Sequence, residues 1–291
     1  MEKDKDDILL KDRSSRGCIS AGYRLYMSNF KRIFHSSWLA AIAFAVVTSI
    51  GGTMMILRPQ LALVILTVTS IIEALFITYG FTVLKQHQQA GTIGCTPHWY
   101  SFDTQIFVRT LKAWLCMIAI VFVVGVVIGF ASVLVGKFLS TYTALGTTLL
   151  MVLVATVFAL PLFYTYIRYI LTDGTGFWRT IASHYGTGLR RWGFIFLVIF
   201  MTTLIGWVCY IITSLPAIIL SMAGNEANMG LLAGDPNGLP SYIGWMSAIV
   251  FLLIGFIQAY VLLSFLFPLY YMYGAIEAHE QEKNKFNKSS L

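Results

Sequence analysis

The stretch AWLCMIAIVFVVGVVIGFASVLVG, residues 113–136, decides the fold because it contains no charged side chain. A helix needs about 20 consecutive apolar residues to cross the hydrocarbon core of a bilayer, and this stretch supplies them. Hydrophobic residues make up 57% of the 291 residues and charged residues only 11%, whereas a soluble domain carries roughly 25% charged residues. The sequence therefore predicts an integral membrane protein.

Further long apolar stretches lie on both sides of this one, so the fold class predicted is all-α, a polytopic transmembrane helix bundle. The six predicted spans cover residues 38–57, 61–84, 113–136, 142–170, 192–222 and 242–276. We expect them to form three hairpins within a single transmembrane domain, residues 19–276. Residues 1–18 and 277–291 are predicted to be cytoplasmic tails.

Lysine and arginine residues set the predicted orientation, because positive charge is retained on the cytoplasmic side of a membrane. With both termini in the cytoplasm, 18 of the 20 positive residues lie on that side, and only Arg58 and Lys137 lie on the other. The net charge of +7 is spread over four segments that flank the membrane, so we expect no nucleic-acid partner.

The chain carries signs of internal repetition. Residues 23–30 and 178–185 share an aromatic–arginine start and a serine–polar–aromatic end, and each segment leads into a tryptophan that opens a span. Their apolar residues recur at helical spacing, which is typical of an amphipathic helix lying in the membrane interface. A third such segment is residues 99–114. We therefore expect a cytoplasmic interfacial helix before each hairpin.

Cations on these helices are predicted to lie near lipid phosphates. They are Arg24, Lys31, Arg32, Arg179, Arg190 and Arg191. Such helices could sense lipid or couple to a partner, or they could simply orient the span that follows, and the second interpretation is favoured.

Residues 20–276 resemble the bacterial six-helix membrane families of unassigned function, which include the membrane domain fused to some glycerophosphodiester phosphodiesterases. The resemblance is carried by YRLYMSNF at 23–30 and by the Pro-Leu-aromatic ends at 161 and 268. It implies a multi-pass protein of the bacterial inner membrane with a role in envelope or lipid homeostasis. The phosphodiesterase domain has no counterpart in this chain.

Glu73 is the only acidic residue inside a predicted span, and an ionisable group in the hydrocarbon core is a functional candidate by default. It could relay protons or bind a cation. The favoured alternative is a hydrogen-bonded carboxyl that holds helices together, with Thr67, Thr69 or a neighbouring helix as its partner.

Other features of the spans have structural explanations. Gly125, Gly129 and Gly136 are small residues at helical spacing and predict close helix packing, inside the bundle rather than at a dimer seam. Pro161 and Pro268 predict kinks near the cytoplasmic ends of two spans. Tyrosines gather beside both prolines and fit an interfacial aromatic belt. Residues 222–241 are predicted to be a connecting loop outside the cytoplasm.

Three function classes remain open on the sequence. The favoured class is a non-enzymatic envelope or lipid-associated protein that interacts with the bilayer and with a membrane or cytoplasmic protein partner. The alternative is a transporter or permease subunit for a small or amphiphilic substrate. An intramembrane enzyme is disfavoured because the spans lack convergent polar residues, and the scattered histidines and cysteines predict no metal or other cofactor.

The charge distribution gives a topology prediction. Reporter fusions after Lys85, Thr172 and Asn284 should report the cytoplasm, because positive residues surround these points. Fusions after Gln60, Ser140 and Leu232 should report the opposite side. One inverted pair in this series would overturn the six-span orientation.

Overall fold

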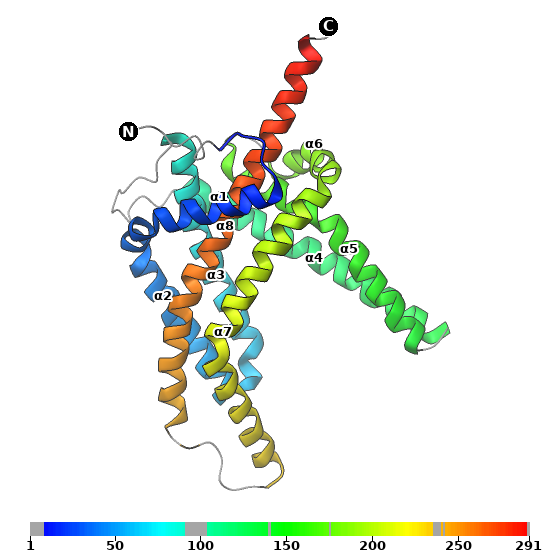
Figure 1. Ribbon diagram of the computed structural model, residues 1–291. Coiled ribbons are helices and arrows are strands. Elements are labelled where there is room, and N and C mark those ends of the chain that lie inside the picture. Colours follow the sequence, from blue (N-terminus) through cyan, green and yellow to red (C-terminus); the bar gives the residue numbers. More distant parts are fainter. Residues whose placement is uncertain are drawn as a thin grey trace. The chain divides into compact units, whose positions relative to one another are not determined.

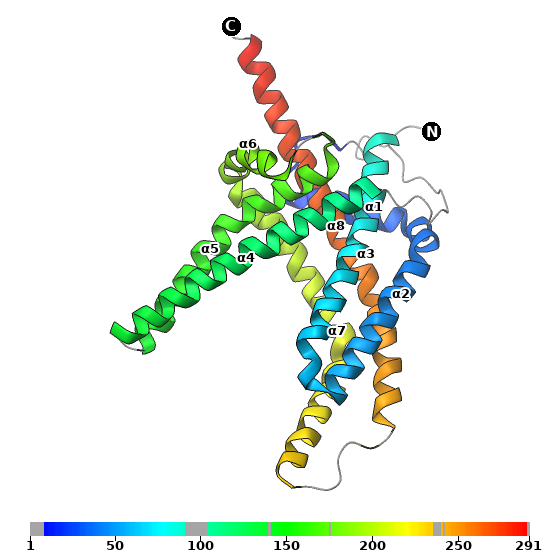
Figure 2. The same ribbon diagram turned by 180° about the vertical axis from the view of Figure 1, so that it is seen from behind.

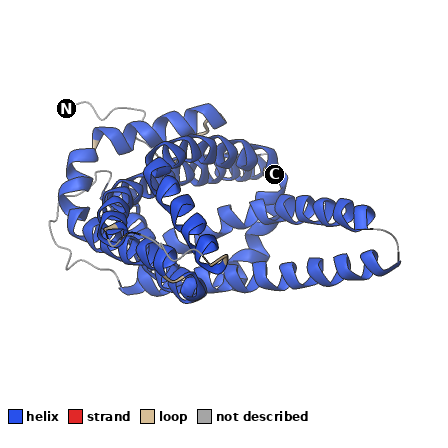
Figure 3. Cartoon of the chain, turned by 90° about the horizontal axis from the view of Figure 1, so that it is seen from below, coloured by secondary structure: helices blue, strands red, loops and turns tan. Residues whose placement is uncertain are grey.

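The computed structural model describes residues 9–90, 104–138, 141–174, 176–234, 240 and 242–289. Within these ranges the protein is 93% helical, with eight α-helices and no strand (Figure 3). The all-α fold class is confirmed. Six of the helices are long and apolar enough to cross a membrane, which supports a multi-pass membrane protein.

The helices follow one another along the chain (Figure 1). The six long helices are α2 (Phe30–Leu57), α3 (Ala62–Ala90), α4 (Thr104–Phe138), α5 (Thr141–Leu171), α7 (Trp192–Leu232) and α8 (Ile243–Ser289). The two short ones are α1 (Ser15–Ser28) and α6 (Phe177–Arg190), and a 3-10 helix, η1 (Pro59–Leu61), joins α2 to α3.

Two helices run past the ends of their apolar stretches, and the predicted loop is wrong over its first half. The predicted loop 222–241 is helical as far as Leu232, and the chain leaves the helix at Gly234, whose φ of +92° is typical of a helix C-terminal stop. Helix α8 continues through the predicted tail to Ser289, and the three Glu and three Lys residues of that segment favour helix.

The segments predicted to be interfacial helices are only partly described as separate helices. Helix α1 ends at Ser28, and α2 begins at Phe30, so the apolar stripe predicted for residues 23–34 is divided between two helices. Met27 on that stripe is 68% exposed, whereas Leu25 and Tyr26 are buried. Helix α6 is separate from α7, but α4 runs from Thr104 into its span without a break, and residues 99–103 lie outside the described residues.

The chain forms two compact units. Unit 1 comprises Met1–Ser20, Asp103–Ile199 and Leu269–Leu291, and unit 2 comprises Ala21–Phe102 and Phe200–Pro268. Helices α1, α7 and α8 therefore each contribute residues to both units. In α8 the boundary falls at Pro268, one of the two prolines that the sequence singles out.

Unit 2 contains α2, α3, the later part of α7 and the earlier part of α8, which run side by side (Figure 2). Hydrogen bonds join α8 to two of its neighbours: Ser49 Oγ donates to the carbonyl of Ala248 at 2.6 Å, and Tyr26 Oη donates to the carbonyl of Tyr260 at 3.0 Å. Gly255 brings α8 so close to α2 that an added Cβ would lie 3.0 Å from Thr48 Cβ. Small residues thus set the helix spacing in unit 2.

In unit 1, α5 packs against both α4 and α6. Gly188 of α6 lies over Pro161, since an added Cβ would be 3.0 Å from the proline Cβ. Tyr164, Tyr270 and Tyr271 are completely buried. The predicted aromatic belt is therefore wrong for these tyrosines: an interfacial belt faces lipid and water, whereas their rings form the core of the unit.

Gly255→Leu should lower the free energy of unfolding by about 1–3 kcal/mol, because the new side chain would collide with α2. The matched control is Gly129→Leu, where an added Cβ meets nothing within 4 Å and stability should be unchanged. Unfolding by SDS titration in mixed micelles measures both. Equal losses at the two sites would contradict the packing described for α8.

Candidate functional site

A groove of about 890 Å³ lies within unit 2, between α2, α3, α7 and α8. Its lining comes from the later half of α2, the first part of α3, the middle of α7 and the earlier half of α8. Most of these side chains are aliphatic or aromatic. Small molecules bind in pockets of this size and apolar character.

Small residues and aromatic rings shape the groove together. Gly206 of α7 has no room for a side chain, because an added Cβ would lie 1.7 Å from the ring of Phe265. A Cβ added at Gly52 of α2 would likewise lie 2.6 Å from the ring of Phe251. Both glycines and both rings line the groove, so its walls depend on positions that tolerate no larger residue.

Glu73 is the one charged residue that lines the groove in the described part of the chain. It is the lining residue of α3 farthest from the start of that helix, and a rise of about 1.5 Å per residue puts it roughly 16 Å along α3. That is about half of the roughly 30 Å that a helix needs to cross a hydrocarbon core.

The carboxyl of Glu73 is exposed and has no hydrogen bond or ion pair with the described residues. The structure therefore does not show the helix-joining hydrogen bond that the sequence led us to favour. Thr69, one of the expected partners, donates its hydroxyl to the carbonyl of Ile65 in its own helix, at 3.0 Å. Glu73 instead presents an unpaired carboxyl to the groove.

A second polar feature of the groove joins α8 to α7. Gln258 Nε2 donates to Ser214 Oγ at 2.9 Å, and both residues belong to the lining. Gln258 is absent from the residues predicted from the sequence, although an amide within a strongly apolar span is a usable signal. The groove thus combines one carboxyl with an amide–hydroxyl pair and with further neutral polar side chains, such as Ser221 and Asn225, among mostly apolar walls.

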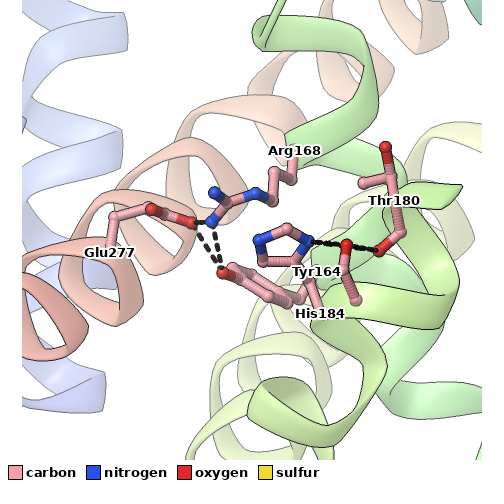
Figure 4. A network of polar contacts seen from close by, with 6 residues as sticks. Tyr164, Arg168, Thr180, His184 and Glu277 are labelled. Atoms are coloured by element: carbon pink, nitrogen blue, oxygen red, sulfur yellow. Dashed lines mark hydrogen bonds and ion pairs between the residues drawn. The ribbon is translucent and has the colours of Figure 1, made fainter. Parts of the chain in front are cut away.

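Unit 1 contains a charged cluster that links α5 to α8 (Figure 4). Arg168 forms an ion pair with Glu277, and its Nη1 also donates to Tyr164 Oη at 3.0 Å. Tyr164 in turn donates to Glu277 Oε1 at 2.6 Å. The side chains of Arg168 and Glu277 are only 21% and 12% exposed, so each charge depends on the other for compensation.

The sequence analysis missed this cluster. From the sequence, Arg168 contributes only to the charge asymmetry that sets the predicted orientation, and Glu277 is the first residue of the predicted C-terminal tail. The spacing of Tyr164 and Arg168, four residues apart on one helical face, was the available signal, but nothing in the sequence indicates that Glu277 meets them.

His184 of α6 is a further polar residue of unit 1, and it contacts two polar groups of its own helix (Figure 4). Its Nδ1 lies 2.6 Å from Ser183 Oγ and 3.3 Å from the carbonyl of Thr180. Burial lowers the pKa of His184, and the positive charge of Arg168 lowers it further, against the opposing effect of the Thr180 carbonyl. The ring therefore favours its neutral form more than a free histidine does.

One group of residues with metal-binding side chains occurs in the described ranges, formed by Asp12, His279 and Glu282. His279 Nδ1 lies 3.6 Å from Asp12 Oδ2, so an ion pair accounts for their proximity once the histidine is protonated. Both carboxylates are exposed.

The other sequence-predicted residues lie apart from the groove. Gly125 and Gly129 have open space where a Cβ would be, and Gly136 faces Ala144 at 3.5 Å, so the expected close packing inside the bundle is not seen at the first two. Pro161 and Pro268 lie inside continuous helices. Five of the predicted interfacial cations are exposed and the sixth is half-buried: Arg24, Lys31, Arg32, Arg179, Arg190 and, half-buried, Arg191.

No protein-family model, curated protein or solved structure matches the chain. The groove and the charged cluster are therefore interpreted from their own geometry.

Removing one partner of the charged cluster should destabilise the protein strongly. Glu277→Gln leaves Arg168 without its counter-charge, and the free energy of unfolding should fall by about 3 kcal/mol. The double variant Arg168→Met with Glu277→Leu should lose less than the summed losses of Arg168→Met alone and Glu277→Leu alone, because neither charge is then left without its partner.

The matched control is the ion pair between Arg109 and Asp173, whose aspartate is 60% exposed. Asp173→Asn should cost about 1 kcal/mol or less. Additive losses in the Arg168–Glu277 cycle, within about 0.5 kcal/mol, would show that the two residues do not interact.

Proposed function

We propose that the protein is a non-enzymatic membrane protein that binds an amphiphilic, lipid-like molecule in the groove of unit 2. The observation that carries the proposal is a groove of about 890 Å³ with mostly apolar walls, in which Glu73 is the one charged residue of the described lining and the Gln258–Ser214 pair is one of several neutral polar groups. An acyl or other apolar body fits such walls, and the few polar groups orient the ligand.

The groove lacks the features that catalysis needs. General acid–base chemistry is most often carried by a histidine or by carboxylates that act together, and nucleophilic chemistry places a hydroxyl, thiol or amine beside a base. Among the described residues that line the groove, Glu73 is the only carboxylate, and no histidine, lysine or cysteine accompanies it. This supports a binding role.

The proposal includes a membrane placement: the bacterial inner membrane, with both termini in the cytoplasm, three helical hairpins, and α1 and α6 in the cytoplasmic interface. The charge asymmetry of 18 to 2 supports the orientation. In this orientation the groove belongs to the outer half of the bilayer, because its lining includes the end of α2 and the start of α3. A likeness to the membrane domains fused to glycerophosphodiester phosphodiesterases fits a lipid-related role.

A transporter or permease subunit for an amphiphilic substrate is the second candidate. Glu73 favours it, because an unpaired carboxyl near the middle of a span is costly unless it serves an ion or a substrate. The two functions differ in flux. A transporter moves the bound molecule across vesicles that contain the protein, with or without a protein partner, whereas a binding protein only retains it.

Filling the groove tests the proposed function. Ile218 lines the groove, and Ile219, the next residue of α7, does not. Ile218→Trp should weaken the binding of a fluorescent acyl-chain lipid analogue about tenfold, because the indole occupies the ligand's volume. Equilibrium titration of the purified full chain in an uncharged detergent measures this.

Ile219→Trp is the control for bulk, since it adds the same side chain at a position that is 66% exposed and outside the groove. Its binding should equal that of the wild type. If both variants bind the analogue equally well, the groove is not the binding site.

A further inference from the structure

We propose that the ligand of the groove is a lipophilic cation, a molecule with a positive charge on an apolar body, and that Glu73 holds the charge. This inference rests on the proposed function and names its ligand class. The observation that points to it is the sign of the charge in the groove: one carboxyl, and no Lys, Arg or His among the described lining residues.

The position of Glu73 strengthens the attraction. Most of the side chains that line the groove are apolar, and charges interact more strongly in such surroundings than in water. The carboxyl has no partner in the described chain, so a ligand cation would be its first counter-charge. An anion at the same point would meet repulsion from the carboxyl.

Aromatic rings supply the second element of recognition. The lining includes Phe44, Trp207, Tyr210, Phe251 and Phe265. The faces of such rings attract cations, most strongly where water is excluded, and they also pack against an apolar body. A carboxyl among aromatic rings is therefore complementary to a cation that carries apolar substituents.

The same features disfavour the phosphate of a common phospholipid. Phosphate binding relies on Arg, Lys or the amides of a helix N-terminus. The exposed cations of unit 2, such as Lys31 and Arg32, lie outside the groove lining. A ligand that places its charged group inside the groove therefore carries a positive charge.

A pair of ions with nearly the same shape and opposite charge tests the inference. Tetraphenylphosphonium and tetraphenylborate each carry four phenyl groups on a central atom. Equilibrium titration of the full chain, purified in an uncharged detergent, should show tetraphenylphosphonium binding at least about tenfold more tightly than tetraphenylborate.

Glu73→Gln should weaken tetraphenylphosphonium binding about tenfold and reduce the preference for the cation. Glu73→Asp, which keeps the charge, should retain that preference and serves also if the glutamine variant does not fold. Glu226→Gln makes the same change on an exposed part of α7 outside the groove, and its binding should match the wild type.

The outcomes separate the two proposals. If Ile218→Trp weakens the binding of both ions while the wild type binds them equally, the groove binds ligand but the choice of a cation is overturned. If the cation is preferred but Glu73→Gln and Glu226→Gln bind it alike, the role of Glu73 is overturned. If Ile218→Trp changes neither the ions nor the lipid analogue, the groove function fails as well.

Discussion

The hydrocarbon core of a bilayer offers no hydrogen-bond partner to the peptide backbone, and the rest of this structure depends on that constraint. A chain with six long apolar stretches can satisfy its backbone there only as helices. Once the helices are formed, each polar side chain still needs a hydrogen-bond or ion-pair partner. The two units differ in how they provide such partners.

Unit 1 compensates its charges internally. Arg168, Glu277 and Tyr164 satisfy one another between α5 and α8, and they are nearly enclosed by protein. Unit 2 joins its helices with neutral hydrogen bonds and close glycine contacts, and it leaves Glu73 unpaired in the groove. A polar group that the fold does not satisfy is expensive in an apolar environment, which is why we assign the ligand to this carboxyl.

Much of the fold could be predicted from the sequence because length and hydropathy alone identify membrane spans. All six spans have a corresponding helix. Helix ends were less predictable. Helix α7 continues through Gly224 and Asn225, although these residues are typical of a turn. It ends only near Gly234, and no sequence pattern predicts the positive φ of that residue. Helix α8 likewise continues beyond its apolar segment, to Ser289.

Of the site, the sequence supplied Glu73 but not its surroundings. A groove depends on which residues of four helices face one another, and the contacts of Gly206 with Phe265 and of Gly52 with Phe251 join residues far apart in the chain. The pairing of Arg168 with Glu277 is equally non-local. For the same reason, the tyrosines assigned to an interfacial belt were misplaced: their burial depends on neighbours that hydropathy cannot show.

The central claim is that the groove of unit 2 is an occupied ligand site in the membrane. The most direct measurement is an electron cryo-microscopy map of the full chain in lipid nanodiscs, recorded with tetraphenylphosphonium. The account predicts density that belongs to no protein side chain between α2, α3, α7 and α8, with its centre beside the carboxyl of Glu73. A groove closed by its own side chains, or a Glu73 carboxyl paired with another helix and no added density, would contradict it.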